Sequence, residues 1–343
     1  FAHLFNKKDL SQIQEAVLWK KYSVADGVFH RLGALLASGA VDGQGPSGLS
    51  KSLVDNYLNA DGTFINPKDE KYKDFNEMFK ERDARLLVTV MHSGPDCKYR
   101  ASSPTNKPMN VRAYDATGTE DEMKEKNEDI VSPNLNGDGN SKSVTGFHIR
   151  LGIDTTYVDN ESETVVVLFR YAEGLLCYAE AAEELDLCTD DVLNKTLKPL
   201  RERAGVTYVK PTKADPNFPF TGLSPVLQEI RRERRSELAL QGFRLDDLMR
   251  WAVAGTLKGQ DGRGRGAYLG EDGVLYKSFS PKGRESLKLV LKDNDGWTDP
   301  LQQYLPQGYL FDLNRDYLLP IPPDELQLNR ELKQNPGWGD ANE

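Results

Sequence analysis

The stretch IRRERRSELALQGFRLDDLMRW, residues 230–251, decides how this chain folds. It sets six arginines among apolar residues that recur at three- and four-residue steps, as in a helix with one buried face. Ser224 and Pro225 supply a cap and a first-turn proline, so we predict a helix from there to about Ala254. Three interpretations of the arginines are open: a nucleic-acid face, an anion site, or a scaffold whose buried charge another helix neutralises.

The apolar residues of this predicted helix form one seam with the arginines beside it. The seam consists of Leu227, Ile230, Leu238, Leu245 and Leu248. Glu229, Glu233 and Glu237 already neutralise part of the arginine run within the helix. The favoured interpretation is therefore an antiparallel helix pair with interlocked charges.

A second helix, the acidic partner, is predicted over residues 163–187, ETVVVLFRYAEGLLCYAEAAEELDL. Its apolar side is formed by Leu168, Ala172, Leu175, Ala179 and Ala182, and its acidic flank by Glu173, Glu180 and Glu184. Tyr171 and Tyr178 lie seven residues apart on this helix and are assigned to packing. Cys177 is expected to be a small core residue.

The remaining segments are less periodic. Residues 10–37 predict one or two helices interrupted near Gly27, and residues 49–58 predict a short helix. The branched, apolar run from Leu86 to Met91 is typical of a buried strand. Residues 95–146 are rich in Asn, Asp, Gly, Ser and Thr, and a loop of that length is where a ligand is first expected.

The whole chain is acidic. It has 343 residues, with 44 lysines and arginines against 53 aspartates and glutamates and a net charge of −9. That balance argues against a nucleic-acid partner, because phosphate backbones select a broad basic surface. No stretch approaches the roughly 20 apolar residues that span a bilayer. Three cysteines are too few for a disulfide framework.

Nothing in the sequence indicates catalysis or a cofactor. A glycoside hydrolase would need two facing carboxyl groups roughly 5 to 10 Å apart, whereas the adjacent Asp246 and Asp247 point about 100° apart around a helix. The segment with Asn134, Asn136 and Asp138 imitates a calcium loop, but Thr145 stands where the closing glutamate belongs. We therefore expect no enzyme, no cofactor and no metal.

Four segments, taken in order, resemble the SusD/RagB family of nutrient-binding lipoproteins of the Bacteroidetes outer membrane. They are GLSKSLVDNYLNADG to ERDARLLVTV (residues 48–90), RYAEGLLCYAEAAEEL (170–185), the basic stretch 230–251, and LLPIPPDELQLNRELKQNPGW (318–338). Ala84 stands where the family usually has proline. The motif residues assigned to structural packing are Arg170, Glu173, Arg231, Arg234, Arg235, Trp251 and Trp338.

The resemblance implies a mainly α fold of tetratricopeptide-like helix pairs, with long irregular loops and a few short strands. Residues 1–343 would form a single SusD-like domain. They would be the C-terminal part, without the family's N-terminal section, which holds the signal peptide, the lipidated cysteine and most helix pairs. The expected location is the cell surface, where the full-length protein is anchored to the outer membrane by its lipid. Its partner would be a SusC-like TonB-dependent transporter.

The ligand implied by the resemblance is a glycan for uptake or, as the alternative, a peptide or protein. Sugar rings stack on aromatic faces, so aromatic residues in polar segments are the candidates. Tyr99 and Tyr114 flank the long loop with Arg100 beside them, and Trp297 in KDNDGWTDP is expected to present an exposed ring. The candidate ligand-binding residues are therefore Tyr99, Arg100, Tyr114 and Trp297; ordinary loop anchoring is the alternative for each.

Overall fold

The computed structural model describes residues 1–32, 48–92, 109–111, 129–131, 143–152, 161–258, 262–279, 281–288 and 290–339. The chain divides into two compact units, one made of residues 1–240 and 264–300, the other of residues 241–263 and 301–343. Among the described residues the regular elements are mainly helices, with two small sheets. The predicted mainly α fold is confirmed.

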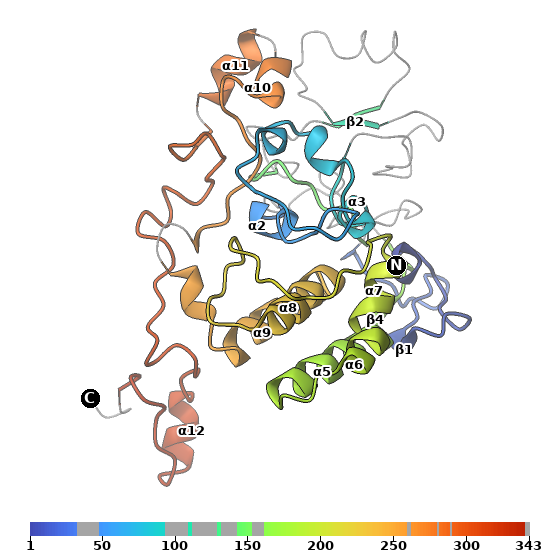
Figure 1. The fold of residues 1–343 in the computed structure, drawn as a ribbon. Coiled ribbons are helices and arrows are strands. Elements are labelled where there is room, and N and C mark those ends of the chain that lie inside the picture. Colours follow the sequence, from blue (N-terminus) through green and yellow to red (C-terminus); the bar gives the residue numbers. More distant parts are fainter. Residues whose placement is uncertain are drawn as a thin grey trace. The chain divides into compact units, whose positions relative to one another are not determined.

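The first unit is built around helices that were expected to pair (Figure 1). Its α-helices are α2 (Lys51–Val54), α3 (Ala84–Thr89), α5 (Tyr171–Glu184), α6 (Asp190–Lys195), α7 (Leu197–Arg203), α8 (Pro225–Glu237), α10 (Val274–Ser278) and α11 (Pro281–Leu287). Short 3-10 helices cover Ala2–Leu4, Glu70–Lys73 and Glu77–Phe79. Helix α8 packs against α5, α7 and α3, which makes it the central element of this unit.

Helices α5 and α8 form the predicted antiparallel pair. Arg170, just before α5, binds Glu237 at the end of α8, while Ser224, just before α8, binds Glu183 near the end of α5. Opposite ends of the two helices therefore meet, as an antiparallel arrangement requires. The apolar face that α5 buries consists of Ala172, Leu176, Ala179 and Ala182.

The start of α8 follows from its local chemistry. The Ser224 hydroxyl accepts a hydrogen bond from the Leu227 N–H at 3.0 Å, and Pro225 occupies the first turn. Ser224 thereby satisfies one of the amide groups that a helix start leaves unpaired. Ile230 is fully buried on the expected core side. The predicted N-terminus of this helix is confirmed.

The predicted end of the basic helix at Ala254 is wrong. Helix α8 stops at Glu237, and α9 (Arg244–Arg250) is a separate helix of the second unit. Leu240 has a φ of 63° and Gly242 a φ of 92°, and residues in this left-handed region cannot continue a right-handed helix. Leu245, expected in the apolar seam, is 64% exposed.

A small antiparallel sheet replaces parts of two predicted helices. Strand β1 (Ala16–Lys20) lies within residues 10–37, and β4 (Val166–Arg170) lies at the start of residues 163–187. The two strands pair with each other. The β-branched valines before α5 favour a strand because their side chains are restricted in a helix, and Leu168, expected on the apolar side, is 56% exposed. A second sheet pairs β2 (Met109–Val111) and β3 (Asp129–Val131) in parallel.

Helix α3 stands where a buried strand was predicted from Leu86 to Met91, so that prediction is wrong. The Asp83 carboxylate caps the helix by accepting a hydrogen bond from the Arg85 N–H at 2.9 Å. Leu86 then enters the core with no exposed surface. Thr89 is buried within the same helix, while Val90 and Met91 are buried just beyond its end.

The second unit contains α9, a 3-10 helix over Ala254–Leu257, and α12 (Pro323–Leu328). Trp251 is buried in it, and the Arg250 guanidinium lies 4.8 Å from its ring centroid. Trp338 is half-buried and donates to the Leu318 carbonyl at 2.8 Å. In the helices that the structure describes, no segment combines the length and the apolar character needed to cross a membrane.

Candidate functional site

One face of α8 carries three glutamates that are bound by arginines from several elements. Glu229 accepts from Arg201 of α7 at 2.6 Å and from Arg232 of α8 at 2.8 Å. Glu233 accepts from Arg201 at 3.1 Å and from Arg85 of α3. These side chains are buried. Each carboxylate thus has the opposite charges that burial in a protein interior requires.

Glu237 closes this network. Arg85 and Arg170 each donate to it at 2.6 Å, and Arg203 donates to it as well. Arg170 also binds Glu15 at 2.7 Å. Burial would raise the pKa of Glu237, but attraction to the three guanidinium groups outweighs it and lowers this pKa to about 2.

The scaffold interpretation of the arginine run accounts for the side chains within α8. Arg231 binds Glu184 of α5 at 3.2 Å, the interlocked contact that was predicted. Arg234 contacts the Cys177 sulfur at 3.6 Å, and Arg235 donates to the Ser52 hydroxyl at 2.8 Å. Cys177 is exposed, so its predicted core role is wrong. Pairing with the helix's own glutamates was predicted, whereas the ion pairs that α3 and α7 form with α8 were not.

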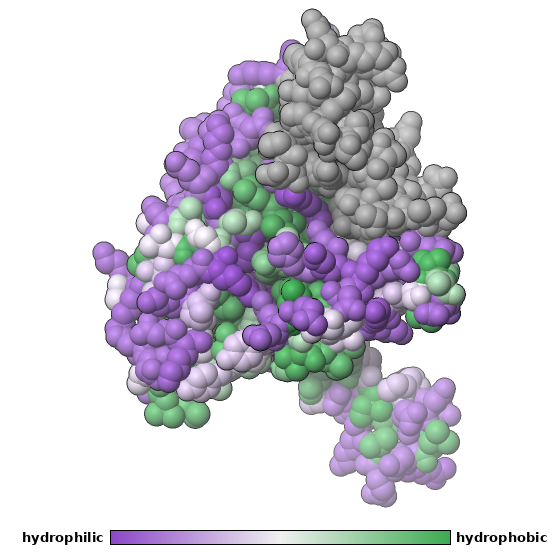
Figure 2. Space-filling model, turned by 90° about the vertical axis from the view of Figure 1, so that its right-hand side faces the viewer, coloured by the Kyte–Doolittle hydropathy of each residue, from purple (hydrophilic) through white to green (hydrophobic). Residues whose placement is uncertain are grey.

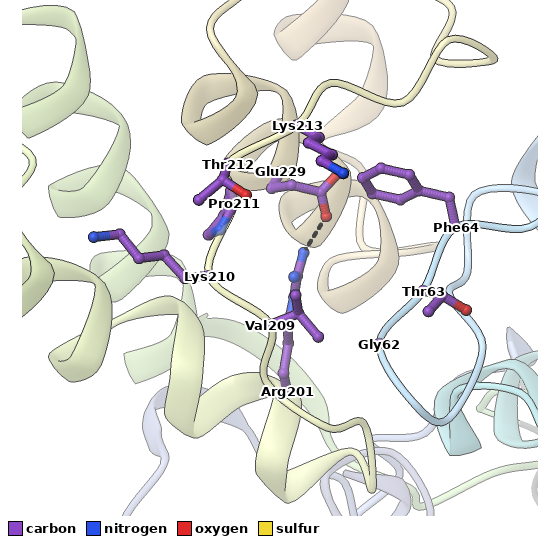
Figure 3. Close-up of a pocket in the computed structure, with 10 residues that line it drawn as sticks. All are labelled: Gly62, Thr63, Phe64, Arg201, Val209, Lys210, Pro211, Thr212, Lys213 and Glu229. Carbon is purple, nitrogen blue, oxygen red and sulfur yellow. Dashed lines mark hydrogen bonds and ion pairs between the residues drawn. The ribbon is translucent and has the colours of Figure 1, made fainter.

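A hollow of about 190 Å³ lies beside this network, between residues 62–64 and residues 209–213. We call it the Phe64 pocket. Its wall combines apolar side chains with polar ones: Phe64, Val209 and Pro211 are apolar, and Thr63, Thr212 and Lys213 are polar. The Arg201–Glu229 ion pair lies among them, and Figure 3 shows Phe64 and Lys213 pointing toward Glu229 while Lys210 extends away.

The turn before the pocket is held by close contacts. Gly62 has a φ of 83°, and a Cβ atom there would lie 2.2 Å from the Thr207 carbonyl oxygen. Only glycine allows that approach. The Asp61 carboxylate accepts from both the N–H and the hydroxyl of Thr63, at 2.9 and 2.7 Å. These bonds lower the pKa of Asp61, with the Thr63 hydroxyl as the largest cause.

The Phe64 ring is half-buried and is supported from within the protein. The Arg232 guanidinium lies 5.2 Å from its centroid and 5.0 Å from that of Phe218. Arg232 is fixed in turn by Asp215, at 2.6 Å. Phe64 is therefore a positioned aromatic surface rather than a free side chain.

A second, smaller hollow of about 130 Å³ is lined by the residues that follow those two segments, within 65–67 and 215–219, and by residues in or next to α2 and α8. Asp55, Asn56, Asn217 and Arg235 supply its polar groups. One carboxylate oxygen of Asp55 is buried and accepts no hydrogen bond from any described residue. Burial raises the pKa of Asp55. We call this space the Asp55 hollow.

Of the four residues expected to bind ligand, Trp297 is the one that the structure describes. Tyr99, Arg100 and Tyr114 lie outside the described residues. Trp297 is 9% exposed, its centroid lies 5.2 Å from that of Tyr268, and the Lys51 ammonium lies 4.3 Å from the ring. The expectation of an exposed Trp297 ring is wrong, because the ring belongs to the core.

Two segments rich in aspartate and asparagine bear on calcium binding: residues 134–138, considered above, and residues 293–295, which precede Gly296. Asn134, Asn136 and Asp138 lie outside the described residues. Asp293 accepts from the Trp297 N–H at 2.9 Å and forms an ion pair with Arg265 at 3.0 Å, as in a closed polar turn. Across the ranges that the structure describes, no three His, Cys, Asp or Glu side chains converge to hold a metal ion.

Residues 20–338 match the sequence model of the SusD family. The chain belongs to the SusD family. Solved structures share the fold of this SusD-family chain. A SusD-like carbohydrate-binding protein from Bacteroides fragilis is 22% identical with a TM-score of 0.62, and the match covers 97% of this chain and 57% of that one. A second SusD-like protein from that species is 20% identical with a TM-score of 0.53, over 85% of this chain and 47% of the other.

The SusD-family chain thus spans about half the length of these solved relatives. No curated protein matches it in sequence. The motif residues retained from the family pattern lie in ordered surroundings: Arg170 within the buried ion network, Glu173 half-buried on α5, and Trp251 buried in the second unit. Phe64, which follows the turn at Asp61 and Gly62, was not among the residues predicted from the sequence.

Proposed function

We propose that this SusD-family chain binds a glycan at the Phe64 pocket and delivers it to a SusC-like TonB-dependent transporter at the cell surface, without chemical change. The observation that carries the proposal is the positioned Phe64 ring, with the hydroxyls of Thr63 and Thr212 lining the same hollow. A sugar ring has C–H faces that stack on an aromatic ring and hydroxyls that need polar partners. The family assignment supports this choice of ligand.

The Asp55 hollow extends the proposed site. The side chains of Asn217 and Arg235 line this hollow, and their polar groups can hydrogen-bond to sugar hydroxyls. Two polar hollows along one pair of segments suit an oligosaccharide better than a single sugar. Tyr99, Arg100 and Tyr114 remain proposed additional contacts.

Peptide uptake is the second candidate. A broad charged groove would favour it, whereas the Phe64 pocket is a small hollow with an aromatic wall. In the full-length protein, the proposed attachment to the outer membrane is an N-terminal lipid. Recovery of the full-length protein from the outer-membrane fraction together with a TonB-dependent transporter would support both the location and the partner.

The binding test is isothermal titration calorimetry of this chain against soluble polysaccharides and mixed peptides. We expect saturable glycan binding that Phe64→Ala weakens about fivefold or more, since one stacked ring contributes roughly 1 kcal/mol or more. Phe29→Ala is the matched control, because Phe29 is an exposed ring outside the pocket. Tyr99→Ala tests the long loop. Peptide binding without glycan binding would favour the second candidate and reject the first.

A further inference from the structure

The Phe64 pocket is basic within an acidic chain. Arg201, Lys210 and Lys213 line it together with a single carboxylate, that of Glu229. The chain as a whole has a net charge of −9. A local excess of positive charge attracts an anionic group to this pocket, although the net negative charge of the chain disfavours anions in general.

The one carboxylate of the lining is already neutralised. Both oxygens of Glu229 accept hydrogen bonds, one from Arg201 at 2.6 Å and the other from Arg232 at 2.8 Å. Burial would raise the pKa of Glu229, yet these two guanidinium groups hold it below its ordinary value. Glu229 therefore stays ionised and internally paired, so its charge is balanced before a ligand arrives.

Lys213 supplies the uncompensated charge. Its side chain is exposed, and it forms no ion pair with any residue that the structure describes. Nearby Asp215 is occupied by Arg232 at 2.6 Å. Lys210 differs, because its ammonium binds Asp190 at 2.6 Å and extends away from Glu229 in Figure 3.

We propose that the Phe64 pocket selects a sugar that carries an anionic group, a carboxylate or a sulfate ester, within an acidic polysaccharide. Phe64 provides the surface for the sugar ring, and the Lys213 ammonium is the counterion of the anionic group. A charge-assisted hydrogen bond of this kind is stronger than one between neutral groups. This inference rests on the proposed glycan-binding function and names its substrate class.

The experiment compares glycans that differ only in charge. The probes are polygalacturonate against its fully methyl-esterified form, and dextran sulfate against dextran, titrated into the whole chain by calorimetry. We expect the anionic member of at least one pair to bind about tenfold tighter, and the advantage to shrink as salt screens the charge. The pair that shows the difference identifies the group as carboxylate or sulfate.

Three variants locate the effect. Lys213→Met keeps the aliphatic stem and should abolish the preference for the anionic probe, whereas Lys213→Arg should keep it. Lys198→Met is the control, because Lys198 is a partly exposed lysine that does not line the pocket. Equal binding of charged and neutral glycans would overturn this inference and leave the proposed function standing. Absence of all glycan binding would overturn both.

Discussion

Arg85 and Glu237 form an ion pair of 2.6 Å in which neither side chain reaches the solvent, with exposures of 2% and 0%. The pair joins α3 to the end of α8, although 152 positions separate the two residues in the sequence. Burying two charges costs several kcal/mol of hydration, and the structure offsets this cost only while every charge keeps its partners. The network around α8 is therefore sensitive to the loss of a single carboxylate.

Replacing Glu237 should test that sensitivity. Glu237→Ala leaves Arg85 and Arg170 without a common carboxylate in the interior, so we expect the free energy of unfolding to fall by about 3–5 kcal/mol. Glu202→Ala is the control, because Glu202 is exposed on α7 and should change stability by less than about 0.5 kcal/mol. Urea unfolding followed by circular dichroism measures both. If the urea midpoints of Glu237→Ala and Glu202→Ala were the same, the ion network would contribute little to stability.

The same residue gives a pH dependence. The pKa of Glu237 falls from its ordinary value of 4.5 to about 2 on folding, so the folded state binds this proton less tightly than the unfolded state. Its stabilisation is complete above about pH 4.5 and is lost as the pH drops toward 2. The difference corresponds to about 3 kcal/mol. Urea unfolding over this pH range should show a steeper decline for the wild type than for Glu237→Gln; parallel curves would contradict the assignment.

The turn at Gly62 should be intolerant of a side chain. Gly62→Ala would place Cβ 2.2 Å from the Thr207 carbonyl, in addition to the cost of a φ of 83°. Gly27→Ala is the matched control, because its φ is 69° and nothing lies within 4 Å of the added carbon. We expect the control to lose roughly 1–2 kcal/mol and Gly62→Ala to lose more, together with glycan affinity. Equal losses of stability for the two variants in thermal unfolding would mean that the loops containing Gly62 and Thr207 can move apart without cost.

Local chemistry made part of the fold predictable. Ser224 and Pro225 predict the start of a helix, and the structure has one there. The pairing of the acidic and basic helices was also predicted. The strand pairing of β1 with β4 was not predictable, because about 150 residues separate the two strands and neither shows its partner locally. Leu86 to Met91 has the composition of a strand, yet a cap at Asp83 and distant glutamates bound to Arg85 favour a helix.

The candidate site was harder to predict than the fold. Phe64 and Lys213 come from loops about 150 positions apart, and only folding places them around one hollow. The prediction of an exposed Trp297 ring failed because it was based on the polar residues next to it in the sequence. In the structure, Tyr268 and Lys51 cover the ring. A polar segment predicts where the backbone turns, but it does not predict what packs over a large side chain.

Exposed apolar residues on the β1–β4 sheet and the adjoining start of α5 predict self-association of this chain. Val17, Leu18, Leu168, Phe169 and Tyr171 are each between 41% and 61% exposed. Figure 2 shows a face that is mostly hydrophilic, with apolar patches set within it. Exposed apolar side chains next to strand edges favour contact between copies.

Sedimentation velocity over a range of concentrations measures this association, and we expect the weight-average mass to rise with concentration. Leu18→Thr combined with Leu168→Thr should restore a monomer, because threonine keeps the strand propensity and removes apolar surface. Leu328→Thr is the control, since Leu328 is 82% exposed but belongs to α12 rather than to this sheet. A wild-type chain that stays monomeric at high concentration would show that the exposed sheet does not bring copies together, and a control as effective as the double variant would place the contact elsewhere.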